Sequence, residues 1–187
     1  DYEVYVDKNI LKPLEMHRSY FDTTPPHLLK HRSHSYYIEN GKRTEGRFDA
    51  NTGITVSNSG LNSPLPDLIK YVNFLVGDPK KRDIYDVILK RSSLEEMWIA
   101  QLPVDTDANG NRGFTSDSGV IFFIDNTLVT HYGHGGDQNG VWSYIDLDPS
   151  KREASIIVFN TNVISPSETP PERDIVGRLR RAVRALF

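Results

Sequence analysis

The residues most able to do chemistry lie in segment 130–143, which reads Thr-His-Tyr-Gly-His-Gly-Gly-Asp-Gln-Asn-Gly-Val-Trp-Ser. The alternation of a strand would place His134 and Gly136 on one face and Gly135 and Asp137 on the other. Two adjacent glycines would let another backbone approach closely, and the imidazole could donate to a carbonyl or carboxylate there. On spacing alone, however, a tight hairpin with a satisfied histidine is the better interpretation, because short glycine-rich motifs are common.

Two other segments carry weaker signals for metal ions. Asp105–Gly110 resembles the first half of a calcium loop, but the twelfth position is Ser116 where glutamate is needed. A loop leading into a strand explains it better. Three histidines have the spacing of one helix face: His27, His31 and His34. No acidic residue lies close enough in the sequence to complete a metal site with them, so a solvated polar loop is the better interpretation. We therefore expect no metal site and no cofactor.

The composition limits the classes of function. Among 187 residues, 22 Lys plus Arg oppose 25 Asp plus Glu, for a net charge of -3, which argues against nucleic-acid binding as the main role. The five arginines of the C-terminal segment are better explained as the solvated face of a helix. The absence of cysteine excludes thiol catalysis and cysteine-bound metals. The longest apolar run, 119–124, is far shorter than the roughly 20 residues of a membrane span.

Hydrophobic periodicity predicts the elements that position these residues. Helices are expected at 3–12, with Val4, Tyr5, Ile10 and Leu11 as an apolar stripe, and at Pro66–Val76. Two shorter helices follow, and Ser93 with Glu96 has the spacing of a capping box at the start of the second. Their ranges are Ile84–Lys90 and Ser93–Trp98. Residues 13–63 lack periodicity and are predicted to be long, irregular, surface-covering structure.

Short β-rich runs separated by turn residues follow residue 112 and predict an antiparallel meander. The runs are Phe114–Ile124, Leu128–His134, Val141–Leu147 and Ala154–Asn160, with Gly135–Gly140 as one of the turns. Residues 172–187 predict an amphipathic helix that covers the sheet, with the arginines opposite an apolar stripe of Ile175, Val176, Leu179, Val183 and Leu186. The expected fold is α+β in a single domain, with helices and long loops at 1–112, the meander at 113–162 and the covering helix at 172–187.

Segment Tyr132–Ser143, followed by Asp146–Pro149 and Ile156–Asn162, resembles the C-terminal part of serine β-lactamase-like hydrolases. This family includes class C β-lactamases, D-Ala-D-Ala carboxypeptidases of the penicillin-binding type and related esterases. Three upstream segments agree in order with its I-x-x-P-L-G-M helix end, its G-G-L-x-S-T-x-x-D-L helix entry and the short helix before its meander: Ile10–Met16, Ser59–Leu68 and Ser93–Trp98. Colinear matches over most of the chain are stronger than any single motif.

The resemblance implies an acyl-transfer site. The family uses a serine in an S-x-x-K pair, a Y-x-N motif and a Lys-Thr-Gly or His-x-Gly strand, and His134-Gly135-Gly136 falls on the last. By that resemblance, His134 orients a substrate carboxylate or stabilises developing charge, and Gly135 and Gly136 bind substrate. The backbone N–H of Asp137 is then one of two oxyanion-hole donors. Histidine in place of lysine favours a peptidase, D-amino-acid amidase or esterase over an efficient β-lactamase.

The nucleophile of that family is missing from the sequence, because no serine is followed three residues later by lysine. Tyr71-Val72-Asn73 spells Y-x-N, but it lies inside a predicted helix, downstream of the family's position. Since the sequence also opens without methionine, we expect a C-terminal portion of a longer hydrolase that is inactive alone. The alternative is a non-catalytic binding or regulatory module that kept the fold.

The expected partners follow from this interpretation. They are a small-molecule or peptide-like substrate and the missing N-terminal half of the same fold, with no nucleic acid and no membrane span. Only the family resemblance bears on the compartment, and it suggests a periplasmic or secreted protein.

Overall fold

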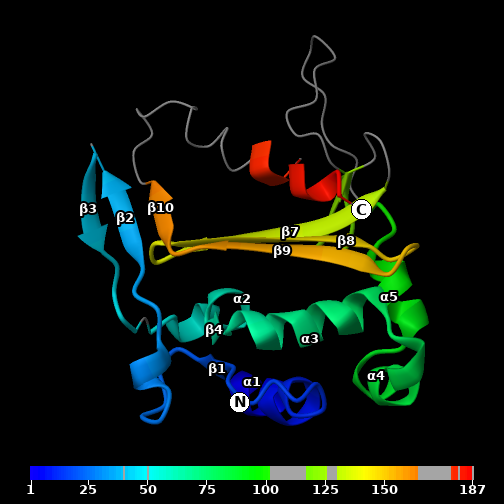
Figure 1. The fold of residues 1–187 in the computed structure, drawn as a ribbon. Helices are drawn as coiled ribbons and strands as arrows, with labels where there is room; N and C mark the ends of the chain where they lie inside the picture. The colour runs from blue at the N-terminus through cyan, green and yellow to red at the C-terminus, as the bar shows by residue number, and fades with distance from the viewer. Residues whose placement is uncertain are drawn as a thin grey trace. The chain divides into compact units, whose positions relative to one another are not determined.

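The computed structural model describes residues 1–39, 41–49, 51–101, 117–125, 130–163, 178–180 and 182–186. Helices and antiparallel strands are mixed along the chain, so the α+β class is confirmed (Figure 1). Residue contacts divide the chain into two compact units. The first unit holds 1–71, 135–144 and 156–187, and the second holds 72–134 and 145–155. One helix and three strands run from one unit into the other along the chain.

The first helix lies where the periodicity predicts it, but only part of the predicted stripe is buried. Val6 and Leu11 are buried, whereas Val4 and Tyr5 each expose 64% of their surface. The two buried residues are five apart, which is the repeat of a π turn rather than of an α-helix. The predicted apolar stripe is therefore confirmed at Leu11 and wrong at Val4 and Tyr5. The element consists of α1 at Tyr2–Val6 and a π-helical turn at Asp7–Leu11.

Much of the described part of 13–63 is irregular, as predicted, but the segment also contains short paired strands and helical turns that the prediction lacks. All four residues of β3 are exposed, so the alternation that predicts a strand is absent there. Strand β2 pairs antiparallel with β3 and parallel with β10, and β1 pairs antiparallel with β4. The elements are β1 (Tyr20–Phe21), β2 (Tyr36–Glu39), β3 (Lys42–Glu45), α2 (Val56–Ser59), β4 (Leu61–Asn62) and β10 (Thr161–Val163), with 3-10 turns at Leu29–His31 and Gly53–Thr55.

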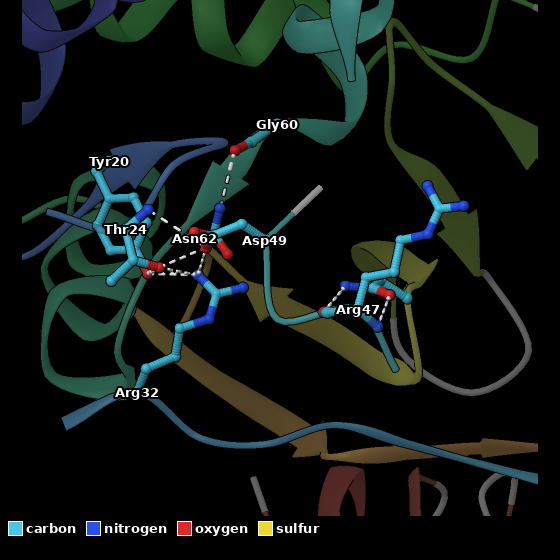
Figure 2. Close-up of polar contacts among 8 residues, drawn as sticks. Tyr20, Thr24, Arg32, Arg47, Asp49, Gly60 and Asn62 are labelled. Carbon is cyan, nitrogen blue, oxygen red and sulfur yellow. Dashed lines mark hydrogen bonds and ion pairs between the residues drawn. The ribbon is translucent and has the colours of Figure 1, made fainter. Parts of the chain in front are cut away.

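The stretch between β1 and β2 is held by a polar cluster around Arg32 (Figure 2). One guanidinium nitrogen, Nη1, donates to Tyr20 Oη at 2.7 Å and to Thr24 Oγ1 at 2.6 Å. The same nitrogen lies 3.1 Å from Asp49 Oδ1, which also accepts from the Thr24 hydroxyl at 2.6 Å. The guanidinium covers the ring of Phe48 at 4.9 Å. Side chains therefore fix segments that are far apart in the sequence.

Helix α3 spans Leu65–Val76 and confirms the helix predicted at 66–76. Its first turn is tied to the segment after α1 by Asp67, which is only 3% exposed. The Asp67 Oδ2 atom accepts from the Arg18 N–H at 2.9 Å and from Ser19 Oγ at 3.0 Å. The Oδ1 atom accepts from Lys70 Nζ at 3.1 Å. A buried carboxylate thus joins two segments of the first unit.

The second unit contains two short helices, α4 (Arg82–Ile88) and α5 (Arg91–Met97). Both are confirmed in existence, but each begins two residues before its prediction. The capping box of Ser93 and Glu96 is wrong, because Lys90 precedes the helix and no side chain caps it. Arg91 anchors this end instead: its Nη1 donates to the Leu75 carbonyl at 2.7 Å, and its guanidinium covers the Trp98 ring at 4.7 Å.

Five strands form the main sheet in the order β5-β6-β7-β8-β9, the antiparallel meander that the turn residues predict. Two boundaries differ. The run predicted as one strand up to Ile124 contains β5 and β6, separated by a turn. The predicted Gly135–Gly140 turn is wrong, because β7 continues to Gln138. The strands are β5 (Asp117–Ser118), β6 (Phe123–Asp125), β7 (His131–Gln138), β8 (Val141–Asp148) and β9 (Glu153–Phe159).

Residues 178–180 and 182–184 are helical, within the range predicted for the last helix. Two residues of the predicted apolar stripe are exposed. Leu179 is 39% exposed and Leu186 is 83% exposed, although both belong to the expected apolar stripe. Arg180 instead lies over the Tyr144 ring, with 3.4 Å from its guanidinium carbon to the ring centroid. A cation–π contact therefore replaces part of the predicted apolar packing.

Candidate active-site strand

The His-Gly-Gly motif lies inside a regular strand. β7 is connected to β8 by only two residues, Asn139 and Gly140, whose φ angles are 50° and 75°. Positive φ at both central residues is the signature of a type I′ hairpin turn, which matches the twist of the flanking strands. A Cβ atom on Gly140 would lie 2.8 Å from the backbone nitrogen of Tyr36. Glycine is therefore required at the turn both by its φ angle and by the space available.

The hairpin determines which way the backbone of β7 points. In a two-residue hairpin the flanking residues, Gln138 and Val141, face each other and exchange backbone hydrogen bonds. One residue earlier, Asp137 must direct its N–H and C=O to the opposite side of β7, and Gly135 must do the same. That side belongs to β6, which pairs only with residues 131–133 of β7.

We call the β6-facing side of residues 135–138 the open edge of β7. In the part of the chain that the structure describes, no strand pairs with this edge. It presents the N–H of Asp137 and the C=O of Gly135, a donor and an acceptor spaced for an extended ligand. The predicted role of Asp137 depends on this N–H alone.

The side chain of Asp137 is engaged elsewhere. Its Oδ1 accepts a hydrogen bond from the Asn162 side-chain amide. The neighbouring turn is also clamped: the Asn139 side chain accepts from the Arg47 N–H at 2.9 Å and donates to the Arg47 carbonyl at 2.5 Å (Figure 2). Gly46 lies close to the same turn, because its Cβ would come within 2.7 Å of the Asn139 carbonyl oxygen. The end of β7 is thereby fixed within the first unit.

His134 presents its imidazole to solvent. The ring is stacked on that of Phe123, with 5.6 Å between centroids and 13° between planes. Stacking engages the faces of the imidazole and leaves its two nitrogen atoms, which lie at the ring edge, able to hydrogen-bond. The arrangement therefore permits the donor role predicted for His134.

The two glycines do not leave an empty strand face. A Cβ atom on Gly135 would lie 2.9 Å from Cδ2 of Tyr144, so the tyrosine ring occupies that side of the strand. A Cβ atom on Gly136 would lie 2.9 Å from Oγ of Ser143, which is the end of a short side chain. The predicted close approach to this strand is therefore made at Gly135 by a tyrosine of the next strand.

The sequence profile of the family described as beta-lactamase matches residues 1–176. The chain belongs to the beta-lactamase family. Among solved structures, a class C beta-lactamase is 18% identical with a TM-score of 0.66, and the match covers 89% of this chain and 48% of that one. The Beta-Lactamase/D-Alanine Carboxypeptidase from Pseudomonas syringae is 15% identical with a TM-score of 0.70, covering 100% and 53%.

A D-stereospecific amidohydrolase from Streptomyces sp. is 20% identical with a TM-score of 0.62, and the match covers 85% of this chain and 44% of that one. These similarities show the β-lactamase/transpeptidase-like fold that the colinear motifs predict. The chain spans about half the length of these structures. No curated protein sequence matches the chain.

The Y-x-N tripeptide lies inside α3, where the sequence predicts it. Burial raises the pKa of Tyr71, and the nearby Tyr2 hydroxyl raises it further. A raised pKa keeps the phenol protonated, which is the opposite of what a general base at neutral pH requires. Tyr71 therefore has the environment of a packed helix residue rather than that of the family's catalytic tyrosine.

The other candidate sites do not assemble in the described residues. The three histidines share no helix face, because only a 3-10 turn ending at His31 forms there, and His34 instead contacts Glu45, with 2.5 Å from Nδ1 to Oε1. Within these residues no three acidic, histidine or cysteine side chains gather to hold a metal ion. The Asp105–Gly110 loop lies outside the described residues. No helix in the described ranges is long and apolar enough to cross a membrane.

Two side chains beside the motif were missed by sequence reasoning. Phe123 stacks on His134, and Asn162 binds the Asp137 carboxylate. Asn162 lies in Ile156–Asn162, one of the segments that carry the family resemblance, so the sequence did offer a signal for it. Phe123 carried no such signal, because an aromatic residue in a strand ordinarily indicates core packing.

Proposed function

We propose that this chain is the C-terminal part of a serine hydrolase that acts through an acyl-enzyme on an amide, ester or β-lactam-type substrate. The nucleophile would come from a part of the protein outside these 187 residues. Membership of the beta-lactamase family supports this proposal, as does a match over about half the length of the related structures. The observation that carries it is the open edge of β7, where the Asp137 N–H is directed away from the β7–β8 ladder.

The open edge suits the chemistry of acyl transfer. When a serine attacks the substrate carbonyl, negative charge develops on the carbonyl oxygen, and a fixed N–H donor stabilises that charge in the transition state. The Asp137 N–H serves as one donor, and the nucleophile's own N–H as the other. An extended, peptide-like substrate can also donate to the Gly135 carbonyl, as in strand addition at a sheet edge.

His134 supplies the charged or polar contact of this strand. Its imidazole orients a substrate carboxylate or stabilises developing charge, since either ring nitrogen can donate when protonated. Gly136 lies on the same face of β7, and among the described residues the Ser143 hydroxyl is what a Cβ atom there would meet. Because Gly136 has no side chain, it leaves room for substrate on this face of β7. Gly135 offers its carbonyl at the open edge.

The test removes one backbone donor from the full-length protein that contains this chain. Proline at position 137 deletes the N–H, and it costs no ladder hydrogen bond because that N–H faces the open edge. We expect Asp137→Pro to lower kcat for a chromogenic ester or β-lactam by about 10²- to 10³-fold. Asp137→Ala keeps the N–H and serves as the matched control.

Circular dichroism and thermal melting of both variants would verify that each remains folded. Equal activity of Asp137→Pro and Asp137→Ala would contradict the oxyanion role. The pure 187-residue chain should take up no fluorophosphonate serine probe, as judged by intact mass, whereas the full-length protein should be labelled once. Failure of the folded full-length protein both to be labelled and to turn over substrate would favour the non-catalytic binding module instead.

A further inference from the structure

We propose that Phe123 is a positioning residue for His134 and holds its imidazole in one orientation by offset parallel stacking. The two rings are nearly parallel, with 13° between their planes and 5.6 Å between their centroids. This inference rests on the proposed function, in which His134 contacts substrate. It adds a residue of β6 to a site otherwise built from β7.

His134 has few other restraints along its own strand. The neighbours on its own face of β7 are Tyr132, whose ring stacks on Trp98, and Gly136, so the strand itself gives the imidazole little lateral support. The side chain is exposed, and an exposed histidine on a strand can occupy several rotamers. A ring that must meet a substrate group reproducibly therefore needs a support from another strand.

Phe123 is placed to give that support. It pairs with Gly133, the residue before His134, and its ring centroid lies 5.6 Å from that of the imidazole. Neighbouring Phe122 is 4% exposed and packs against Trp98, whereas Phe123 is 42% exposed. The sequence thus commits one phenylalanine to the core and leaves the next at the surface, where its main aromatic contact is the imidazole.

The geometry also suits a donor. Stacking covers a face of the imidazole, whereas Nδ1 and Nε2 lie in the ring plane and remain accessible. A hydrogen bond from the main chain or a carboxylate would occupy one of these nitrogens. Holding the ring by its face fixes the direction of both nitrogens without using either.

The first experiment observes the side chain directly in the 187-residue chain. The imidazole protons of His134, assigned by loss of their NMR signals in His134→Gln, should show an upfield ring-current shift. Phe123→Leu should abolish that shift and increase the mobility of the ring, while Phe123→Tyr should keep both. Imidazole shifts that are identical in wild type and Phe123→Leu would overturn the proposal.

The second experiment measures turnover in the full-length protein. Phe123→Leu should lower kcat/KM about 10- to 100-fold through misplacement of the imidazole, and Phe123→Tyr should restore it. Combined with His134→Gln, the Phe123→Leu change should cost nothing further, because both act through one ring.

The outcomes separate this inference from the proposed function. If His134→Gln lowers turnover and Phe123→Leu does not, the positioning role alone fails. If His134→Gln itself leaves turnover unchanged, the assigned role of His134 fails, and the positioning role fails with it. An additive loss in the double variant would show that Phe123 acts independently of the histidine and would also overturn the inference.

Discussion

The buried carboxylate of Asp67 accepts three hydrogen bonds within the first unit. Burial raises its pKa, but hydrogen bonds from the Arg18 N–H, Lys70 and Ser19, together with the charge of Lys70, outweigh that effect and hold the pKa below 3.8. The folded state therefore binds the ionised form better than the unfolded chain does. This preference contributes to stability and makes that contribution dependent on pH.

We expect Asp67→Asn to lower the free energy of unfolding by about 1–3 kcal/mol at pH 7, because it leaves charged and backbone donors with a poorer acceptor. Urea unfolding monitored by circular dichroism would measure the change. Asp83→Asn, at an exposed position in the first turn of α4, should change stability by less than about 0.5 kcal/mol. Equal effects of the two substitutions would show that the Asp67 contacts are not stabilising.

The sign of the pH dependence follows from the lowered pKa. The Asp67 contribution is complete above the ordinary value of 3.8 and is lost as pH falls through the lower folded-state pKa. Asp148 acts in the same direction, because hydrogen bonds from Ser150 and Lys151 outweigh the effect of burial and lower its pKa. Wild type and Asp67→Asn should therefore converge in stability as pH falls below about 4. A gap that stays constant down to pH 2 would contradict this account.

At the site itself, residue types were predictable but their surroundings were not. His134 and the glycines could be identified from a motif and its family order. Phe123 and the Tyr144 ring over Gly135 could not, because both contacts depend on strand register, which residue spacing does not specify. The roles of His134 and Asp137 remain predictions, to be tested by the variants above.

Among the elements, the turn between β5 and β6 carries unusual strain. The Gly119 N–H donates to the Phe122 carbonyl at 2.9 Å, so only Val120 and Ile121 form the turn. Ile121 has φ of 74°, a conformation that costs a β-branched residue about 1–3 kcal/mol. Its side chain is 66% exposed, so packing contacts offset little of this strain energy.

We expect Ile121→Gly to raise the free energy of unfolding by up to about 1 kcal/mol, since glycine adopts positive φ freely and the lost contacts are few. Val120→Gly is the matched control, because its φ is not positive. That substitution should instead destabilise by about 0.5–1 kcal/mol through unfolded-state entropy. Thermal and urea unfolding of the two variants would check the difference. Destabilisation of similar size in both would contradict strain at Ile121.

Helices and strands were predictable where the hydrophobic periodicity is strong. They were not where pairing with a distant segment determines the secondary structure. Helix α3 was predictable because Leu68, Val72 and Leu75 repeat at helical spacing. Strand β3 was not, because its exposed polar residues gain their regular structure only by pairing with β2. The Gly135-Gly136 pair indicates a turn by composition, yet ladder pairing with β8 keeps it in a strand.

At the scale of the whole molecule, the first unit exposes many apolar side chains. Val4 and Tyr5 on α1 are each 64% exposed, and Leu65 and Ile69 on α3 are 50% and 48% exposed. Exposed apolar groups on neighbouring helices often mark an interaction surface. We propose that the N-terminal half of the same fold is the partner that covers them.

The pure 187-residue chain should then bind the dye ANS and self-associate, as seen by fluorescence and analytical ultracentrifugation. Coexpression with the upstream segment of the same protein should reduce both signals. Ile69→Glu should weaken dye binding without loss of helical circular dichroism, whereas Lys90→Glu should not. A pure chain that is monomeric and binds no dye would argue against this partner.

The family and fold were predictable at this scale because several motifs occur in one order along the chain. The division of contacts into two units was not, since it depends on which segments far apart in sequence pack together. No local pattern in segments 135–144 or 156–187 indicates that they contact residues 1–71.

The packing of Gly135 against Tyr144 also constrains how this sequence could have changed over time. A side chain at position 135 would collide with the tyrosine ring, at an expected cost of about 1–3 kcal/mol for overpacking. A smaller residue at position 144 would open that space, so a double-mutant cycle of Gly135→Ala and Tyr144→Ser should show favourable coupling. In a lineage under selection for stability, we expect Tyr144 to be replaced by a smaller residue before Gly135 is replaced. The two sites would then change in one preferred order.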